Sequence, residues 1–310
     1  MEGNNMKTEL LVDAEEAEIV KAQSEHQSFG RTIWREIKGD KMAIVALFIL
    51  SVILLIAYIG PLFIDQEEAK LTNFMQIYEE PSKEFLLGTD RGGRDILTQL
   101  IIGARNSITI GAAITLIAGF LGLMIGLISG YFGGKVDFVI MRALDFLMVL
   151  PTLMLIIVFV VIVPTFNVWS FIGIMSILLW FGKARLIRSR ALAERELDYV
   201  NASKTLGTPN WKIMIFEVFP NLSSLVIVNM TLTLAGNIGI ETGLTFLGFG
   251  LPESTPSLGT LITYAKHPDV MENKWWVWLP ASLLILVVML CINYIGQAIK
   301  RASDARQRLT

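Results

Sequence analysis

The chain has 310 residues, of which 53% are hydrophobic and only 17% are charged, and its mean hydropathy is +0.57. Soluble proteins carry about 25% charged residues. The deficit is concentrated, because five stretches contain no Asp, Glu, Lys or Arg: residues 42–64, 106–134, 146–182, 218–240 and 275–299. A helix of ~20 apolar residues crosses a bilayer. Every stretch is therefore long enough to cross, and a soluble domain is excluded.

The longest uncharged stretch, residues 146–182, is long enough for two crossings. As one helix it would extend about 55 Å, close to twice the ~30 Å hydrocarbon core. Pro164 and Asn167 lie where a turn could divide it. We therefore predict an all-α integral membrane protein with six transmembrane helices.

Residue types that build catalytic or metal centres are scarce. The lone Cys291 lies in an apolar stretch and cannot form an internal disulfide, and the only histidines are His26 and His267. The sequence has no Walker-type G-x-x-x-x-G-K-[ST], so we expect no nucleotide site on this chain. We predict no catalytic residue and no bound metal, cofactor or nucleic acid.

The basic residues predict the orientation. Six crossings place both termini on one side, and if that side is the cytoplasm, its segments hold 19 of the 26 Lys and Arg residues. Cytoplasmic loops of membrane proteins carry the excess of Lys and Arg. We therefore predict cytoplasmic N- and C-termini, although Arg91, Arg94 and Arg105 fall in an outside loop.

The charged segments divide the chain into parts. We predict a cytoplasmic tail over residues 1–41, a first crossing over 42–64, an outside loop over 65–104, five helices over 105–299 and a cytoplasmic tail over 300–310. Within the first tail, Phe29–Lys41 mixes apolar and basic residues, which suits either a helix at the inner membrane surface or a solvated linker. Trp275, Trp276 and Trp278 are typical of an aromatic belt at the start of the last helix.

Small residues recur at helical spacing in two apolar stretches. Gly122, Gly126 and Gly130 are four residues apart, so they share one helix face and let another backbone approach closely. A second set comprises Gly236, Gly239 and Gly243. Both sets indicate tight packing within the bundle, and the alternative is a surface that slides between two transport states.

Ionisable residues are missing from the middle of the apolar stretches. Glu241 comes closest, and Arg142 and Asp145 have the spacing of an ion pair at a helix end. Ion-coupled carriers usually hold carboxylates, histidines or unwound polar segments at mid-membrane. We therefore expect the energy for any transport to come from another subunit.

The cytoplasmic loop over residues 183–221 has the pattern of a helical hairpin. Gly207 stands where a left-handed C′ residue would close the first helix, Thr208 can cap a second helix, and Pro209 suits its first position. Pro220 either ends the segment or starts the next crossing. Such a hairpin could bind a cytoplasmic partner, although an ordinary loop with two short helices has the same pattern.

Within this loop, Asn201-Ala202-Ser203 is followed after three residues by Gly207, and later by Phe219-Pro220-Asn221. This spacing resembles the EAA-type motif of binding-protein-dependent ABC importer permeases. Asn201, Ser203 and Phe219 depart from that motif, while the small residues, the glycine and the proline keep their places. The resemblance implies coupling to an ATPase through the following residues: Asn201, Ala202, Ser203, Gly207 and Pro220.

The outside loop contains LGTDRGGRD over residues 87–95, followed by GARNS over 103–107. It is similar to the LGTDxxGRD…GARxSL signature of the C-type permease subunit in oligopeptide, dipeptide and nickel importers. The matching residues are Gly88, Thr89, Asp90, Gly93, Arg94, Asp95 and Arg105. The two aspartates can also pair with Arg91 and Arg94 and hold the loop against the bundle.

A third segment, TFLG at 245–248 with PSLG at 256–259, resembles SFLGLG…TPSWG of the same subfamily, and the resemblance covers residues 38–300. It implies the type I ABC importer permease fold and peptide import across the bacterial cell membrane. The implied partners are a B-type permease, two ABC ATPase subunits that bind ATP and Mg, an extracytoplasmic peptide-binding protein, the peptide substrate and membrane lipid.

Three other functions stay open. Importers of nickel or other small solutes share these segments. An ion-coupled carrier or channel would show ionisable groups inside the membrane, and a scaffold without transport activity would carry the EAA-like spacing by coincidence. Co-purification with ATPase subunits would separate these functions.

Overall fold

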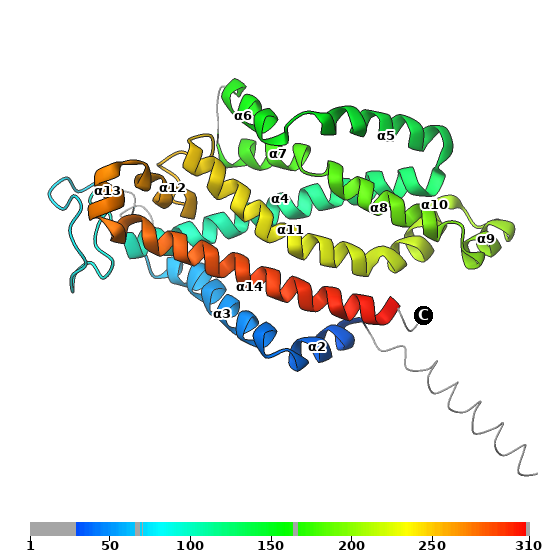
Figure 1. The fold of residues 1–310 in the computed structure, drawn as a ribbon, viewed down its shortest axis with the longest axis horizontal. Coiled ribbons are helices and arrows are strands. Elements are labelled where there is room, and N and C mark those ends of the chain that lie inside the picture. The colour runs from blue at the N-terminus through cyan, green and yellow to red at the C-terminus, as the bar shows by residue number, and fades with distance from the viewer. Residues whose placement is uncertain (1–28, 66–68, 70, 164–166, 308–310) are drawn as a thin grey trace, which may run out of the picture.

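The computed structural model describes residues 29–65, 69, 71–163 and 167–307, and its regular elements are helices (Figure 1). Within these ranges there is no strand, and Thr89 and Asp95 form only an isolated antiparallel bridge. The all-α fold predicted from the sequence is confirmed.

Four helical segments are long and apolar enough to cross a membrane. They are α3 with the turn η1 (Lys41–Leu62), α4 (Ile96–Phe132), the continuous run of α10, η3 and α11 (Asn210–Leu247), and Trp275–Asp304 of α14 (Trp275–Gln307). The described residues reach the predicted six spans if each of two bent helix pairs is counted as one span.

Helix caps set the ends of the first two spans. α3 (Lys41–Ile59) is capped by Asp40, whose carboxylate accepts hydrogen bonds from two backbone N–H groups of the first turn, at 2.9 and 3.3 Å. α4 begins at Ile96 and not at the predicted boundary near residue 105, because Asp95 caps it through the Thr98 N–H at 2.9 Å. The outside loop therefore ends earlier than the sequence predicts.

Each of the other two candidate spans is a pair of helices joined at a bend. They are α5 (Gly134–Val149) with α6 (Thr152–Ile162), bent by 83°, and α7 (Val168–Leu178) with α8 (Phe181–Glu194), bent by 40°. The first bend lies at Leu150, whose backbone is extended (φ −77°, ψ 135°). The following Pro151 disfavours the helical conformation at Leu150, which explains the bend.

These bends correct the predicted division of residues 146–182 into two full crossings. α6 has only 11 residues, so its span also needs α5, which lies largely before the uncharged stretch. Asn167 does turn the chain, because its side-chain oxygen accepts a hydrogen bond from the Ser170 N–H at 3.0 Å and caps α7. Pro164, the other predicted turn residue, lies outside the described residues.

A π-helix, η3 (Met214–Val218), joins α10 (Asn210–Ile213) to α11 (Phe219–Leu247). Pro220 lies in the first turn of α11 and has no N–H to donate to an earlier carbonyl. A π-turn accommodates such an interruption of the helical hydrogen-bond ladder. Pro220 therefore does not end the segment, because the second arm of the hairpin continues through η3 into α11.

The core surrounds α4, which packs against α8 and α11 (Figure 1). The largest cluster joins α4 to α5, α6, α7, α8 and α11, and its most deeply buried large side chains are Ile114, Leu144, Ile156, Phe171 and Met175. On the outside, large apolar side chains such as Phe120 and Phe146 are exposed. Such a surface suits contact with lipid or with another subunit.

The predicted juxtamembrane segment contains α2 (Phe29–Gly39). Ile37 is buried against Ala298 of α14, and Glu36 is paired with Arg301 of α14 at 3.2 Å. The helix is therefore packed on the bundle, and its position at the inner membrane surface stays a prediction. The remaining elements are α9 (Asp198–Thr205), α12 (Leu258–Thr263), η4 (Tyr264–Lys266) and α13 (Pro268–Asn273).

Candidate functional site

The residues singled out in the sequence fall into separate sets. The hairpin of α9 and α10 lies at one end of the bundle, and the loop carrying Gly88–Asp95 lies near the other end with α12 and α13 (Figure 1). The glycines of α4 lie between the two ends. The structure therefore presents two candidate interaction ends joined by a packed helix, and not one compact site.

α9 closes with a Schellman motif at Gly207. The Gly207 N–H donates to the Lys204 carbonyl at 3.0 Å, and the Thr208 N–H donates to the Ser203 carbonyl at 3.1 Å. Gly207 has φ +81°, and a Cβ added there would meet none of the described atoms within 4 Å. The position therefore favours glycine because of its left-handed backbone and not because of crowding.

The second arm of the hairpin begins one residue later than predicted. Pro209 has an extended backbone (φ −59°, ψ 138°) and occupies the N-cap position of α10, so the prediction of Thr208 as the cap is wrong. The N–H of Thr208 is used in closing α9. The first helical residue, Asn210, is instead held by the Tyr131 hydroxyl of α4, which donates to its side-chain oxygen at 2.9 Å.

One face of the hairpin is buried against the end of α4. Val200 of α9 is fully buried in a cluster with Ile213 of α10 and Tyr131 of α4. The Lys204 ammonium lies over the Tyr131 ring, 5.6 Å from its centroid, and donates to the Arg195 carbonyl at 3.2 Å. The hairpin is therefore attached firmly to the bundle.

Side-chain hydrogen bonds join the hairpin to the helices on both sides of it. The Asn221 amide donates to the Tyr199 hydroxyl at 2.7 Å, and that hydroxyl donates to the Glu194 carboxylate at 2.8 Å. Burial, and then the bond to Glu194, raise the pKa of Tyr199 to about 12, so the phenol keeps the proton it donates. The Asn201 amide donates to the Glu196 carbonyl at 3.1 Å.

The hairpin and the following η3 also expose apolar side chains. Leu206, Trp211 and Phe216 are 86%, 53% and 68% exposed, and we call these three residues the hairpin patch. The rings of Trp211 and Phe216 meet edge to face with centroids 6.5 Å apart. Exposed apolar groups on a polar hairpin suit a protein contact. The predicted coupling residues are also accessible: Asn201, Ala202, Gly207 and Pro220 are exposed, and Ser203 is half-buried.

Gly122, Gly126 and Gly130 form a face of α4 that packs directly on α8. A Cβ added at Gly126 would lie 2.5 Å from the Ala184 carbonyl oxygen, and one at Gly130 would lie 2.6 Å from the Ala191 Cβ. The two backbones are therefore as close as the glycine spacing predicts.

The second set of glycines on α11 does not form such a face. A Cβ at Gly236 or Gly243 would meet nothing within 4 Å in the described part of the chain, and one at Gly239 would meet only the flexible side chain of Met289. The prediction of close packing is therefore wrong for this set.

Two ion pairs join α8 to α5. Arg188 pairs with Asp137, and Arg185 pairs with Asp145. The predicted pair between Arg142 and Asp145 is wrong, because Arg185 reaches Asp145 from the neighbouring helix. The Arg142 guanidinium lies instead over an aromatic ring of α5, 5.4 Å from its centroid.

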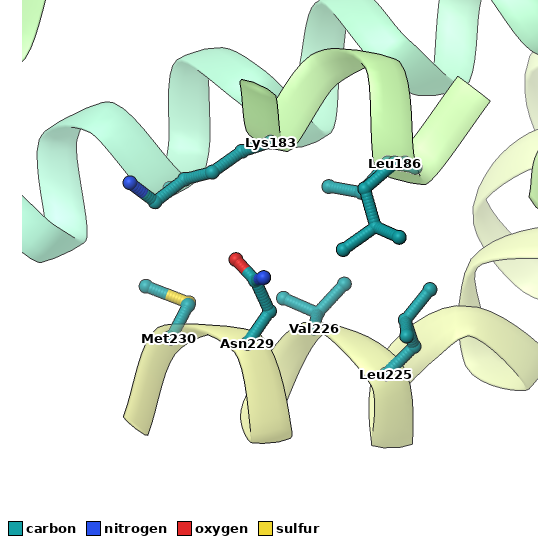
Figure 2. Close-up of a pocket in the computed structure, with 8 residues that line it drawn as sticks. Lys183, Leu186, Leu225, Val226, Asn229 and Met230 are labelled. Carbon is teal, nitrogen blue, oxygen red and sulfur yellow. The ribbon is translucent and has the colours of Figure 1, made fainter. Parts of the chain in front are cut away.

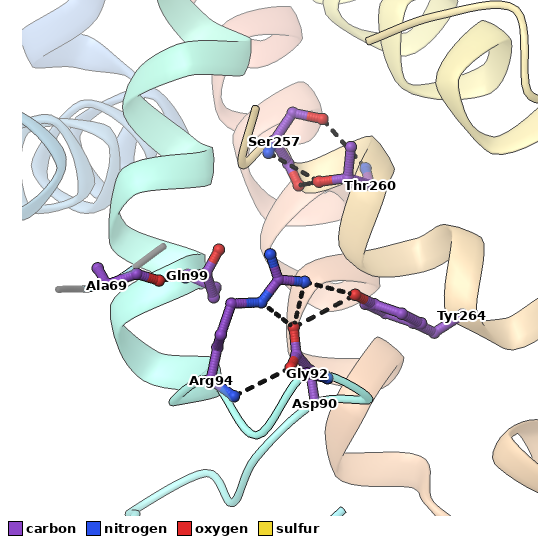
Figure 3. A network of polar contacts seen from close by, with 8 residues as sticks. All are labelled: Ala69, Asp90, Gly92, Arg94, Gln99, Ser257, Thr260 and Tyr264. Carbon is purple, nitrogen blue, oxygen red and sulfur yellow. Dashed lines mark hydrogen bonds and ion pairs between the residues drawn. The ribbon is translucent and has the colours of Figure 1, made fainter. Parts of the chain in front are cut away.

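The loop at the other end folds around the fully buried Asp90 (Figure 3). Its carboxylate accepts the Gly92 N–H at 2.7 Å, the Arg94 N–H at 3.0 Å and the Arg94 guanidinium at 2.8 Å. Arg94 also donates to the Tyr264 hydroxyl at 2.8 Å, and that hydroxyl donates to Asp90 at 3.2 Å. Burial and then the charge of Asp90 raise the pKa of Tyr264, which keeps its hydroxyl proton.

Three further signature residues shape this loop. Thr89 is fully buried, and its hydroxyl accepts the Glu79 N–H at 2.8 Å. Gly88 and Gly93 both have φ +70°, and a Cβ added there would lie 2.5 Å from the Glu79 carbonyl oxygen and 1.9 Å from that of Asn73. Both positions therefore require glycine for conformation and for space.

The expected pairing among the charged residues of the loop is only partly right. Asp90 pairs with Arg94, but Asp95 caps α4 and Arg91 is exposed. Arg105 lies within α4, where its guanidinium donates to the Asn106 side chain at 3.4 Å.

A buried cation that no motif marks lies inside the membrane-spanning part. Lys183 of α8 is 7% exposed, and its ammonium donates to the Leu179 carbonyl at 3.1 Å, which satisfies an acceptor at the bend after α7. Figure 2 shows Lys183 and Asn229 among the residues that line a cavity. The volume of this cavity is about 10 Å³, close to the minimum that holds one water molecule. Across the described residues, no group of three or more His, Cys, Asp or Glu could hold a metal.

Known proteins are similar to this chain in sequence over most of their length. The family profile described as "Binding-protein-dependent transport system inner membrane component" matches residues 122–309, and that of "N-terminal TM domain of oligopeptide transport permease C" matches 28–81. Oligopeptide transport system permease protein OppC of Lactococcus lactis subsp. lactis (strain IL1403) is 52% identical over 281 residues, which cover 90% of this chain and 96% of that protein.

Two further relatives have other printed names. Oligopeptide transport system permease protein AmiD of Streptococcus pneumoniae (strain ATCC BAA-255 / R6) is 35% identical over 287 residues, 90% of each chain. Dipeptide transport system permease protein DppC of Bacillus subtilis (strain 168) is 32% identical over 293 residues, which cover 94% of this chain and 90% of that protein.

Proposed function

Because the chain belongs to the binding-protein-dependent transport system inner membrane components, we propose that it is the C-type permease subunit of an ATP-driven ABC importer of peptides. The chain is a multi-pass membrane protein and a transport permease, not an enzyme. The observation that carries the proposal is the 52% identity to an oligopeptide permease over 90% of the chain.

The proposal includes the partners of such an importer. A B-type permease would form the second half of the translocation path, and an extracytoplasmic binding protein would deliver the peptide. Two cytoplasmic ATPase subunits would bind ATP and Mg and supply the energy. The exposed apolar surface around the bundle could contact both a second permease and lipid.

The hairpin is the proposed contact with the ATPase. Its patch presents Leu206, Trp211 and Phe216 to solvent, and the neighbouring Asn201 and Ala202 are exposed. Aromatic side chains of this kind often anchor protein interfaces. The buried face of the hairpin is fixed to α4, so a force on the patch would act on the bundle.

α8 is the proposed connection between the hairpin and the membrane helices. It packs backbone to backbone on the glycine face of α4, and Arg185 and Arg188 bind it to α5. Close packing and ion pairs together favour a rigid unit of α4, α5 and α8 over a sliding surface. Closure of the ATPase dimer would then move the three helices together.

The proposed location is the bacterial cell membrane, with both termini and the hairpin in the cytoplasm. The excess of basic residues on that side supports this orientation. It would place the Asp90 loop on the outside, where the binding protein arrives.

Uptake by the reconstituted complex tests the proposal. Proteoliposomes would hold this chain with its permease and ATPase partners, and labelled oligopeptide would be added with the binding protein. We expect uptake that requires both ATP and the binding protein. Uptake of a nickel chelate but of no peptide would change the substrate class, and uptake without the ATPase would overturn the proposal.

A further inference from the structure

Glu241 is fully buried in α11, within a membrane span, and the proposed coupling path does not use it. A carboxylate away from water needs hydrogen-bond donors or a cation. The Thr245 hydroxyl donates to it at 3.2 Å and the Thr242 hydroxyl at 3.3 Å, and the hydroxyls of Ser107 and Ser257 lie beside the carboxylate. We call these five residues the Glu241 hub.

Backbone N–H groups orient three of the four hydroxyls of the hub. Each hydroxyl oxygen accepts an N–H, so its own hydrogen is free to point at the carboxylate. The pairs are Leu251 N–H to Thr245 at 3.2 Å, Leu258 N–H to Ser107 at 3.1 Å, and Thr260 N–H to Ser257 at 3.0 Å. Such chains of hydrogen bonds strengthen one another in a low-dielectric interior.

The hub therefore ties together parts of the chain that are far apart in sequence. Ser107 comes from α4, and Thr242 and Thr245 come from α11. Ser257 is the N-cap of α12, where it forms a capping box with Thr260. The Leu258 N–H in the first turn of α12 donates to Ser107 of α4 at 3.1 Å, and Ser257 lies beside the Glu241 carboxylate of α11, so the start of α12 is held against two membrane helices.

Close backbone packing makes this arrangement possible. A Cβ added at Gly103 of α4 would lie 3.0 Å from the Ser257 carbonyl carbon. A Cβ at Gly259 would lie 3.1 Å from the Thr242 carbonyl oxygen of α11. α12 therefore enters between α4 and α11 at a depth that a larger residue on either side would not allow.

The far end of the same segment is held by the second buried carboxylate. α12 leads directly into η4, whose first residue, Tyr264, bonds to Asp90 and Arg94 (Figure 3). We call residues 257–264 the anchored segment. Its first residue lies beside Glu241 of the bundle and its last is bonded to Asp90 of the outside loop, so both of its ends are held.

We propose that Glu241 is a positioning residue for transport, which fixes the anchored segment to α4 and α11. Displacing α12 would take Ser257 away from the Glu241 carboxylate and the Leu258 N–H away from the Ser107 hydroxyl, at a cost for each buried group that loses a partner. The anchored segment would therefore move with α4 when the hairpin moves the bundle, and would not open separately. This inference rests on the proposed function, since it concerns a step of transport.

Hydrogen exchange and uptake, measured on the same reconstituted complex, test the inference. Glu241→Gln keeps the shape of the side chain but turns one acceptor oxygen into a donor that faces hydroxyl hydrogens. We expect amide exchange in residues 257–264 to rise about tenfold or more, as for a buried group that loses its partner. The maximal uptake rate should fall, while the apparent affinity for the loaded binding protein stays unchanged.

Glu253→Gln is the matched control, because Glu253 is exposed in the loop before the anchored segment. It should change neither exchange nor uptake. Ser107→Ala removes one hydroxyl of the hub. It should raise amide exchange in residues 257–264 and lower the maximal uptake rate, each by less than Glu241→Gln does. Its effect should not add to that of Glu241→Gln, because both changes disturb one network.

The outcomes separate the inference from the proposed function. Unchanged exchange in residues 257–264 in both hub variants would show that Glu241 does not hold the segment. Faster exchange with normal uptake would overturn its role in transport. If Glu241→Gln fails to assemble, Ser107→Ala decides by the same two readouts. A wild-type complex that takes up no peptide would contradict the proposed function, and the exchange measurement would still decide whether the hub holds the segment.

Discussion

The Thr208 N–H donates to the Ser203 carbonyl at 3.1 Å across Gly207, and this bond sets the direction in which the second arm of the hairpin leaves the first. It requires the left-handed backbone of Gly207, at φ +81°. The hairpin patch begins at Leu206, directly before this turn. The shape of the exposed surface therefore depends on one backbone conformation.

Two replacements of Gly207 test whether the left-handed backbone, and not a lack of space, requires glycine at this position. Valine is strongly disfavoured in the left-handed region, by ~1 kcal/mol or more, whereas asparagine adopts it more readily. Because an added Cβ would meet no described atom within 4 Å, both side chains have space. We expect Gly207→Val to abolish peptide uptake without lowering the amount of protein in the membrane. Gly207→Asn should retain most uptake, and full activity of the valine variant would contradict the role of the turn.

Removing the aromatic side chains of the hairpin patch should weaken binding of the ATPase. Trp211→Ser and Phe216→Ser each delete an exposed ring without opening a cavity in the core. We expect each to reduce the ATPase recovered with the affinity-purified chain, and the double variant to lose most of it. Trp169→Ser is the control, since Trp169 is 79% exposed on α7, outside the hairpin. Equal ATPase recovery from all variants would place the contact elsewhere.

The close contact of α4 with α8 predicts a large effect from a single methyl group. Gly126→Ala would place a Cβ 2.5 Å from the Ala184 carbonyl oxygen, so the helices must separate. Gly173→Ala on α7 would meet nothing within 4 Å in the described structure, and alanine favours a helix by up to ~1 kcal/mol. Cys291, the only cysteine, is buried and allows unfolding to be followed with a thiol-reactive dye.

We expect Gly126→Ala to lower the midpoint of thermal unfolding, and Gly173→Ala to leave it unchanged or raise it. The same midpoint for both variants would show that α4 and α8 are not in direct backbone contact.

The buried pair of Asp90 and Arg94 should stabilise the outer loop. Asp90→Ala leaves the Arg94 guanidinium, whose side chain is 14% exposed, without its carboxylate. Breaking a buried pair in this way costs ~3–5 kcal/mol. We expect a lower unfolding midpoint, with part of the loss restored in Asp90→Ala/Arg94→Met. Arg91→Ala, at an exposed neighbour, should have little effect, and equal losses for both single variants would argue against the network.

The spans and the closing of α9 could be predicted from local sequence because their causes are local. An uncharged stretch marks a membrane helix, and a glycine at the right offset marks a left-handed C′ position. The role of α5 could not be predicted in this way. This helix carries Asp137 and Asp145 and is still part of a candidate span with α6, and arginines of α8 pair with both aspartates. Hydropathy along the chain does not show that a charged residue has a partner on another helix.

The Glu241 hub shows more clearly that tertiary contacts cannot be predicted from local sequence. The sequence marks Glu241 as the ionisable residue that comes closest to mid-membrane, but two of its polar neighbours, Ser107 and Ser257, come from other elements. The early start of α4 has a different, local cause: Asp95 lies in a charged segment that the sequence assigns to the loop, and its carboxylate caps the helix through the Thr98 N–H. The pairing of distant residues in the hub, by contrast, is set by tertiary structure.

Cross-linking from the hairpin measures the proposed ATPase contact itself. Asn201→Cys introduces a thiol at an exposed position of α9, and Ser82→Cys introduces one in the outside loop at the opposite end. In the assembled, importing complex, a short cross-linker should join Asn201→Cys to an ATPase subunit and should give no such product from Ser82→Cys. An intact importing complex in which Asn201→Cys forms no ATPase adduct, or forms one only as often as Ser82→Cys, would contradict coupling through the hairpin.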